Sequence, residues 1–171
     1  MNRILLGGTL ALLLSAGLQA QTPEPNTLVS FIKPEKFIDA SDQGLGMGSS
    51  PRVLNDIKSF LEKLGAQYLP AGQQLSIEIR NIDLAGRFDP MPGRPSEWVR
   101  MQREADWPRI QLHYRLSVQG QLLREADANI ADMNYLQKAR SSYSSQPLGY
   151  EKRMLAEWFK NSFAERQTKA Q

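Results

Sequence analysis

Five arginines and two tryptophans lie within one segment of the chain, residues 87–109. They are Arg87, Arg94, Trp98, Arg100, Arg103, Trp107 and Arg109. A guanidinium group binds two oxygens of a carboxylate or phosphate at once, and it also stacks on aromatic rings. The segment could therefore bind an anionic ligand of the cell envelope or a partner protein. The other interpretation is a loop that the two tryptophans pack over the domain, while the charged ends of the arginines remain in water.

A second polar cluster follows the last predicted strand, in the segment Asp132-Met133-Asn134-Tyr135-Leu136. Asp132 and Asn134 are residue types that end strands and begin turns, because their side chains bond to nearby backbone groups. The apolar members could then close the open end of a hydrophobic core. The alternative is a binding rim in which this segment meets the arginine-rich one. The residues of that candidate rim are Arg87, Arg94, Trp98, Trp107, Arg109, Asp132, Asn134 and Tyr135.

Three carboxylates, Asp83, Asp132 and Glu151, are the candidates for acid–base chemistry in a hydrolase or another envelope enzyme. A pocket that collects two or more of them would favour catalysis, whereas a shallow surface with an exposed tryptophan or tyrosine would favour binding. The single histidine, His113, has no G-x-S-x-G nucleophile motif beside it, so we expect an exposed histidine on a strand. The sequence therefore gives no residue a catalytic role, and we favour a binding domain over an enzyme.

The composition gives little support to metal and cofactor sites. One histidine and no cysteine leave too few ligands for zinc, iron or copper. Residues 39–44 contain two carboxylates and lack the spacing of a calcium loop. Glycines 44, 46 and 48 precede a helix without the spacing of a nucleotide-binding motif, which predicts a connecting loop, with an anion at the helix N-terminus as the alternative. The 21 basic and 18 acidic residues are mixed along the chain, so we expect neither a cofactor nor nucleic acid.

The first twenty residues differ in character from the rest of the chain. Met1-Asn2-Arg3 is basic, residues 4–14 are almost wholly apolar, and small residues lead to Ala20. This is the layout of a secretory signal peptide cleaved after Ala20, and a retained membrane anchor is the weaker alternative because the apolar run is short. The absence of cysteine excludes disulfides and a lipid-modified cysteine at the cleavage site. We therefore expect a soluble periplasmic or secreted protein, not lipidated and without a further transmembrane segment.

The elements that must position the candidate residues follow from hydrophobic periodicity. Strands are predicted at residues 27–32, 74–79, 110–118 and 121–130, and the second of them resumes after a β-bulge near Asn81. The last two strands form a hairpin that turns at Gln119-Gly120. A helix begins at Pro51 behind a serine cap and ends at Gly65. A short helix from Ser96 to Arg103, with Trp98 on its inner side, is predicted within the arginine-rich segment.

The last helix is predicted to run from residue 148 to residue 163. Its apolar stripe consists of Met154, Leu155, Trp158, Phe159 and Phe163. We expect Trp158 to lie buried against the sheet. Lys152 and Arg153 lie in the first turn, where the helix dipole disfavours positive charge. An acidic group at a strand end, such as Asp132, should therefore compensate this basic pair.

The order β-α-β-β-β-α predicts an α/β fold of the α+β kind, a two-layer sandwich. We expect a mixed sheet of about four strands with both helices on one face, and a right-handed crossover between two parallel first strands. The predicted organisation is a signal peptide at residues 1–20 and a flexible lead-in at 21–26. A single α/β domain at 27–164 and a disordered tail at 165–171 complete the chain.

Five segments carry a resemblance to a known family: VSFIKPEKFIDAS, LPAGQQLSIEIRNIDLAGRF, WPRIQLHYRL, ADMNYL and LGYEKRMLAEWF. Together they resemble the bacterial secreted proteins grouped as domain of unknown function 3016, over nearly all of the mature chain. The most specific motifs are Asp-Leu-Ala-Gly at 83–86, Asp-Met-Asn-Tyr-Leu at 132–136 and Tyr-Glu-Lys-Arg-Met-Leu at 150–155. The resemblance implies a signal peptide and an envelope location, and it supplies no catalytic residue.

Overall fold

The computed structural model describes residues 25–43, 48–138 and 142–164. The elements in these ranges are β1 (Thr27–Phe31), a 3-10 turn η1 (Pro34–Lys36), α1 (Pro51–Tyr68), β2 (Gln73–Asp83), β3 (Arg87–Met91), β4 (Arg94–Met101), β5 (Arg109–Val118), β6 (Gln121–Ala131) and α2 (Gly149–Phe163). The predicted signal peptide, most of the lead-in, glycines 44 and 46, and the predicted tail lie outside the described residues.

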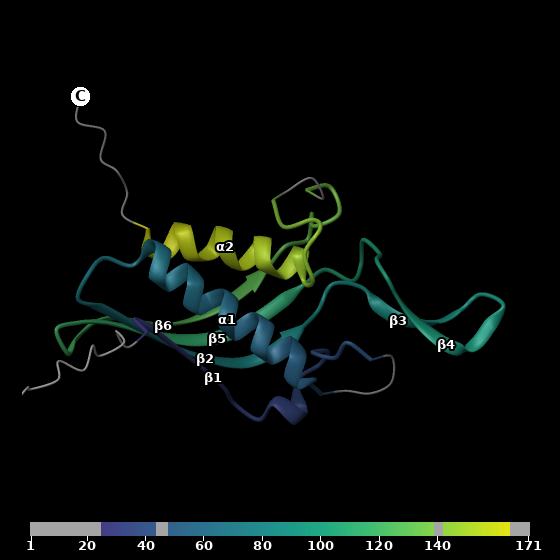
Figure 1. Cartoon of the computed structure of the whole chain (residues 1–171), viewed down its shortest axis with the longest axis horizontal. Coiled ribbons are helices and arrows are strands. Elements are labelled where there is room, and N and C mark those ends of the chain that lie inside the picture. The colour runs from purple at the N-terminus through teal and green to yellow at the C-terminus, as the bar shows by residue number, and fades with distance from the viewer. Residues whose placement is uncertain (1–24, 44–47, 139–141, 165–171) are drawn as a thin grey trace, which may run out of the picture.

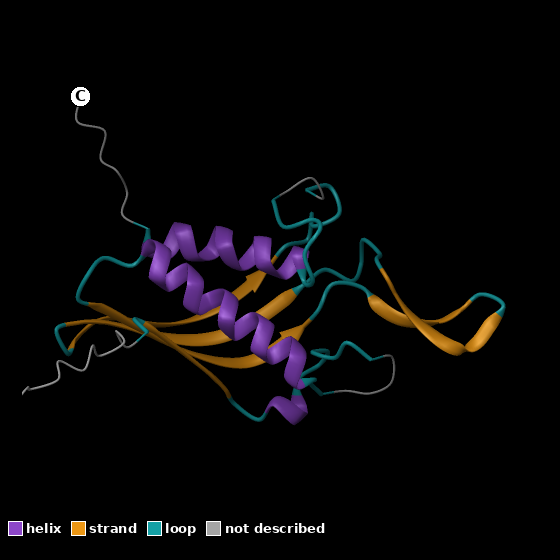
Figure 2. Cartoon of the chain, viewed as in Figure 1, coloured by secondary structure: helices purple, strands orange, loops and turns teal. Residues whose placement is uncertain are grey.

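Four strands form one sheet in the order β1-β2-β5-β6, and both helices cover the same face of it (Figures 1 and 2). β1 is parallel to β2, while β2, β5 and β6 pair antiparallel. The predicted α+β fold with a mixed sheet of four strands is therefore confirmed.

None of the helices in the described ranges combines the length and the apolar character that a membrane crossing requires.

α1 begins and packs as predicted, but it ends later. The Ser50 hydroxyl accepts the Val53 N–H at 3.3 Å, and Pro51 occupies the first turn. Its buried apolar stripe faces the sheet and consists of Val53, Ile57, Leu61 and Leu64. The helix continues through Gly65 to Tyr68, so the predicted end at Gly65 is wrong.

Gly65 is a packing residue in the helix interior. A Cβ atom placed on it would lie 1.7 Å from Oγ1 of Thr27 and 3.1 Å from Oδ1 of Asn26. Thr27 is fully buried on β1, so its side chain has no free space into which it could move. The Asn26 side-chain amide also donates to the Gly65 carbonyl at 3.1 Å. The missing side chain at position 65 therefore allows α1 to approach the start of β1.

Gly65→Ala is expected to destabilise the domain, although alanine favours a helix over glycine by about 1 kcal/mol. Forcing a methyl group against Thr27 should leave a net loss of about 1–3 kcal/mol in the free energy of unfolding, measured in urea. Ser59→Ala, at an exposed position of the same helix, is the control and should not lower stability. A Gly65→Ala protein more stable than its parent would contradict the close packing at this position.

The strand irregularities predicted from the sequence are present. The register of β2 against β5 shifts between Ile79 and Asn81, and this bulge keeps both Ile79 and Ile82 fully buried. β5 and β6 are joined by Gln119 and Gly120, whose φ angles of 50° and 79° are those of a type I′ hairpin turn. Both the bulge and the hairpin are therefore confirmed.

The face of the sheet opposite the helices carries charged and polar side chains of β5 and β6. On it, His113 of β5 lies between two carboxylates of β6, with Nδ1 2.8 Å from Asp127 and Nε2 2.9 Å from Glu125. The hydrogen bond with Asp127 is the main cause that raises the pKa of His113 above its ordinary value. His113 faces outward from β5 as predicted, but its side chain is only 17% exposed rather than freely exposed, because it belongs to a cross-strand charge network.

β3 and β4 form a separate hairpin that projects beyond the sheet (Figure 1). The short helix predicted from Ser96 to Arg103 is wrong, because β4 is a strand in which Trp98 pairs with Pro90 of β3. The turn is Pro92-Gly93, and the φ of Gly93, 78°, fits the second central position of a type II turn. Beyond an irregularity between Pro90 and Met91, the two flanking strands pair antiparallel, and their ladder replaces the helical hydrogen bonds. Trp98 consequently lies on the surface, with 40% of its area exposed.

Candidate functional site

The base of the hairpin is fixed to the domain by ion pairs around Asp83, the last residue of β2. Arg87 donates to Oδ1 of Asp83 at 2.7 Å, and Arg109 donates to Oδ2 at 2.7 and 3.1 Å. Asp83 is only 1% exposed, and it joins the start of β3 to the start of β5. The hydrogen bond to Asp83 is the main cause that raises the pKa of Arg87 above its ordinary value, so this guanidinium remains charged.

Arg100, near the end of β4, makes a second anchor. Its Nη1 and Nη2 atoms donate to the two oxygens of Asp39 at 2.8 and 2.9 Å. The same atoms donate to the backbone carbonyls of Ser41, Ala85 and Gly86. Because Arg87 also lies 3.6 Å from Asp39, the two anchors form one system. We name it the base network, and its members are Asp39, Asp83, Arg87, Arg100 and Arg109.

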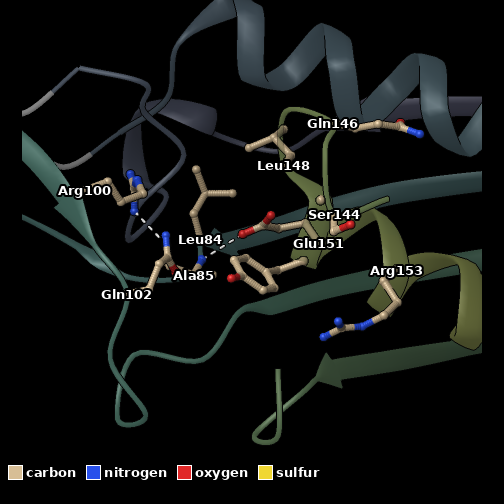
Figure 3. Close-up of a pocket in the computed structure, with 11 residues that line it drawn as sticks. Leu84, Ala85, Arg100, Gln102, Ser144, Gln146, Leu148, Glu151 and Arg153 are labelled. Carbon is tan, nitrogen blue, oxygen red and sulfur yellow. Dashed lines mark hydrogen bonds between the residues drawn. The ribbon is translucent and has the colours of Figure 1, made fainter. Parts of the chain in front are cut away.

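A pocket of about 340 Å³ lies beside the base network, where the residues after β2 and β4 meet the start of α2 (Figure 3). Its lining includes the polar residues Gln102, Gln146, Tyr150 and Glu151 and the apolar residues Leu84 and Leu148. The volume is within the range of small-molecule sites, roughly 300–1,000 Å³.

Glu151 lies in the first turn of α2 and is only 3% exposed. Its Oε1 atom accepts the Ala85 N–H at 2.8 Å, which ties the start of α2 to the end of β2 (Figure 3). Burial raises the pKa of this carboxyl, and the charge of Asp39 adds to the shift. The hydrogen bonds from Ala85 and from its own backbone N–H, and the charge of Arg100, oppose it. Perturbed carboxyl groups of this kind are enriched at functional sites.

The raised pKa of Glu151 predicts a pH-dependent loss of stability. The folded protein keeps the proton at pH values where the unfolded chain has lost it, so ionisation favours the unfolded state. The loss begins as the pH rises past the unfolded pKa of about 4.3 and is complete above the folded pKa. Glu151→Gln keeps a hydrogen-bond acceptor for Ala85 and cannot ionise. Its stability relative to the parent is therefore expected to increase between about pH 4 and about pH 7.

Urea unfolding of both proteins at the two pH values measures this change. Glu157→Gln, at an exposed position of the same helix, is the matched control and should show no such trend. An equal stability difference between Glu151→Gln and the parent at both pH values would contradict the raised pKa.

Arg153, which lines the pocket, forms a buried ion pair with Asp132. Nη2 of Arg153 lies 2.9 Å from Oδ2 of Asp132, and the two side chains are 6% and 7% exposed. The same nitrogen donates to the Tyr135 carbonyl at 3.0 Å. The expectation that Asp132 compensates the basic start of α2 is thus confirmed for Arg153. Lys152 pairs instead with Asp56 of α1, at 2.9 Å.

The structure separates the arginines and tryptophans of the candidate binding rim. Arg87 and Arg109 are committed to the base network, and the guanidinium carbon of Arg109 lies 5.3 Å from the centre of the Trp107 ring. Arg94 and Trp98 are exposed on the hairpin. Arg87 and Arg109 therefore anchor the hairpin to the domain, whereas Arg94 and Trp98 are exposed and could contact a partner.

The other rim residues surround Arg153. Asp132 and Tyr135 are buried, while Asn134 is exposed. Asp132 accepts the Asn134 N–H at 3.2 Å, which is the local turn expected for this segment. The Tyr135 hydroxyl donates to the Arg103 carbonyl at 2.7 Å, so this segment does meet the arginine-rich one. Because Asp132 and Tyr135 are covered, they support the site from within rather than contact a ligand at the surface.

The three candidate catalytic carboxylates do not gather in one pocket. Glu151 lines the pocket, Asp83 lies in the base network, and Asp132 is paired with Arg153. Within residues 25–43, 48–138 and 142–164, no group of three or more His, Cys, Asp or Glu side chains is placed to hold a metal ion.

Two contacts that build the site could not be identified from the sequence. Arg100 bonds to Asp39 across 61 residues, and Glu151 bonds to Ala85 across 66 residues. The two residues of each pair lie far apart in the sequence, and only the tertiary fold brings them together. No short sequence motif could therefore predict either contact. The hairpin did leave one signal, the turn dipeptide Pro92-Gly93, although Pro90 and Pro95 on either side of it are unfavourable for strands.

Comparison with known proteins identifies one family. The model of the family described as "Protein of unknown function (DUF3016)" matches residues 26–161, which include the sheet, the hairpin and nearly all of α2. No curated protein and no solved structure matches the chain.

Proposed function

Because this chain belongs to the DUF3016 family, whose description assigns no activity, we propose its function from the geometry of the hairpin. We propose a non-enzymatic binding domain of the cell envelope, in which the β3–β4 hairpin contacts a partner protein. The observation that carries this proposal is the exposure of large apolar side chains on an arm that is fixed at its base.

The exposed apolar residues of the arm are of the types that protein interfaces favour. Met91 is 39% exposed, Trp98 is 40% exposed and Met101 is 44% exposed. Tryptophan, methionine and arginine are enriched at such interfaces, and tryptophan is common among the residues that dominate binding energy. A two-stranded hairpin alone is marginally stable in water, so the base network supports the arm in its projecting position. A partner that covers the arm would stabilise it further.

The charges of the arm favour a protein over an anionic polymer or lipid surface. Arg94 lies 3.4 Å from Glu97, and Arg103 pairs with Asp89. Each exposed arginine is therefore matched by a carboxylate on the same hairpin. A strongly anionic ligand would be attracted by the arginines of the hairpin and repelled by its carboxylates. A protein surface can present acidic groups to the arginines and basic groups to the carboxylates.

The N-terminal sequence supports an envelope location. Residues 1–20 have the basic, apolar and small-residue regions of a secretory signal peptide, and the chain has no cysteine for lipid attachment. N-terminal sequencing of the protein from the periplasmic fraction is expected to begin at Gln21. A chain that retains Met1, or that carries a lipid, would contradict export in soluble form.

The alternative function is a carboxylate-dependent hydrolase or another envelope enzyme. A second carboxylate in the Glu151 pocket would favour it, because hydrolysis by carboxylates commonly uses a pair in different protonation states. Asp83 and Asp132 are instead paired with arginines, and neither carboxylate lines that pocket. An exposed tryptophan on the surface favours binding over catalysis, and Trp98 is such a residue.

Comparative affinity capture tests the binding function. Envelope proteins that co-purify with the parent are quantified beside those that co-purify with the Trp98→Ala, Met101→Ala double variant. The control is Leu123→Ala, which changes an apolar residue of β6 that is 60% exposed. A partner of the arm should be retained by the parent and the control and lost by the double variant. Equal recovery with all three proteins would contradict the proposal.

A further inference from the structure

We propose that the pocket beside Glu151 binds a small uncharged ligand with several hydroxyl or amide groups, which is the chemistry of a sugar unit. The pocket, about 340 Å³ in volume, is lined by residues from after β2, the end of β4 and the start of α2. It does not include the exposed residues Met91 and Trp98 of the arm, so this site can exist whether or not the hairpin binds a partner.

Most donor atoms of the charged groups around the pocket are already paired within the domain, and among the described residues Nε of Arg153 is a buried donor without a hydrogen-bond partner. Arg100 donates to Asp39 and to three backbone carbonyls. Arg153 donates to Asp132 and to two backbone carbonyls. An anionic ligand would have to compete with these partners and would also meet Glu151. A cationic ligand would approach Glu151 beside two guanidinium groups, so the pocket disfavours a net charge of either sign.

The other polar groups of the pocket can each donate and accept hydrogen bonds. Gln102 and Gln146 carry amides, and Tyr150 carries a hydroxyl. One oxygen of Glu151 accepts the Ala85 N–H, and Figure 3 shows the other oxygen directed away from Ala85. That second oxygen can accept a hydrogen bond from a ligand hydroxyl, or donate one when the carboxyl is protonated. Ligand hydroxyls and amides need partners of both kinds, and this lining provides them.

The apolar part of the lining fits the same ligand class. Leu84 and Leu148 form a wall of the pocket. A sugar ring has hydroxyl groups around its edge and C–H groups on its faces, so it can contact polar and apolar walls at once. An inorganic ion has no apolar face and would gain nothing from the leucines. The combined lining therefore favours a ring-sized neutral ligand over an ion.

Amide chemical shifts of the purified protein, followed while ligands are added, test this site. The neutral probes are glucose, N-acetylglucosamine and their methyl glycosides, and the charged probes of comparable concentration are inorganic phosphate and methylammonium. At least one neutral probe is expected to bind with a dissociation constant on the order of 1 mM. The shifts of Ala85, Gln102 and Glu151 should change with saturation, and neither charged probe should displace the sugar.

Two variants locate the binding. Gln102→Ala should weaken it by about threefold to tenfold, because it removes one hydrogen bond between the ligand and an exposed amide. Gln121→Ala, an exposed glutamine at the hairpin turn between β5 and β6, should leave it unchanged. Saturable binding of phosphate or methylammonium in place of the sugars would overturn the proposal. The absence of saturable shifts with every neutral probe, or equal binding by Gln102→Ala, would also overturn it.

Discussion

Replacing Asp132 with alanine is expected to lower the free energy of unfolding by about 3–5 kcal/mol. The reason is that Arg153 would keep its buried charge and lose the carboxylate that balances it. The pair lies 2.9 Å apart with both side chains less than one-tenth exposed, so water cannot replace the missing partner without a rearrangement. Urea unfolding of the variant and the parent measures the loss.

Two further variants isolate the uncompensated charge as the cause. Lys138→Ala removes a side chain that is 47% exposed and lies 3.6 Å from Asp132, and it should cost at most about 1 kcal/mol. The double variant Asp132→Ala, Arg153→Met removes both buried charges and should recover much of the lost stability. A single Asp132→Ala variant as stable as Lys138→Ala would show that the buried pair contributes little.

Phe159→Ala is expected to destabilise the domain by about 3–5 kcal/mol, because it removes a large ring and leaves a cavity. Phe159 is fully buried, and its ring centre lies 4.9 Å from that of Phe163 and 6.0 Å from that of Trp158. Stacked and edge-to-face aromatic pairs contribute beyond the area they bury. The measurement is again the free energy of unfolding in urea.

The neighbouring positions of α2 provide the comparison. Glu157 is exposed, and Glu157→Ala should cost less than about 0.5 kcal/mol. Trp158 packs against the sheet as predicted, with its ring centre 5.9 Å from that of Tyr114, but it is half-buried and not buried. Trp158→Ala should therefore cost less than Phe159→Ala. If neither aromatic substitution lowered stability, the stripe of α2 would be a docking surface and not part of the core.

The sequence correctly predicted those elements that depend on a pattern of neighbouring residues. Strict alternation identified β5, a phase change located the bulge near Asn81, and Gln119-Gly120 identified the hairpin turn. Gly65 was misread because a glycine near a helix end is usually a stop signal. Its role depends on Thr27, a residue of another element, and no local pattern contains that contact.

The sequence indicated which residue types the candidate site contains, but it did not predict how these residues are arranged. The arginines and tryptophans drew attention to the segment that contains the β3–β4 hairpin, but the short helix predicted from Ser96 to Arg103 was wrong, because β4 is a strand. The partner of each charged side chain depends on tertiary contacts. The ion pairs of Arg87 and Arg109 with Asp83 therefore could not be predicted. The prediction that an acidic group such as Asp132 compensates the basic first turn of α2 is confirmed for Arg153, whereas Lys152 pairs with Asp56.

The most direct test of the binding function is photo-cross-linking from the arm in cells that produce the protein. A photo-reactive amino acid at position 98 is compared with the same amino acid at position 123 on β6, because both native side chains are exposed apolar ones. The account predicts one discrete protein adduct from position 98 and none from position 123. An excess of unlabelled parent should suppress the adduct in extracts, whereas the Trp98→Ala, Met101→Ala variant should not. Adducts of equal yield from both positions, or no adduct from position 98, would contradict the hairpin as the partner-binding element.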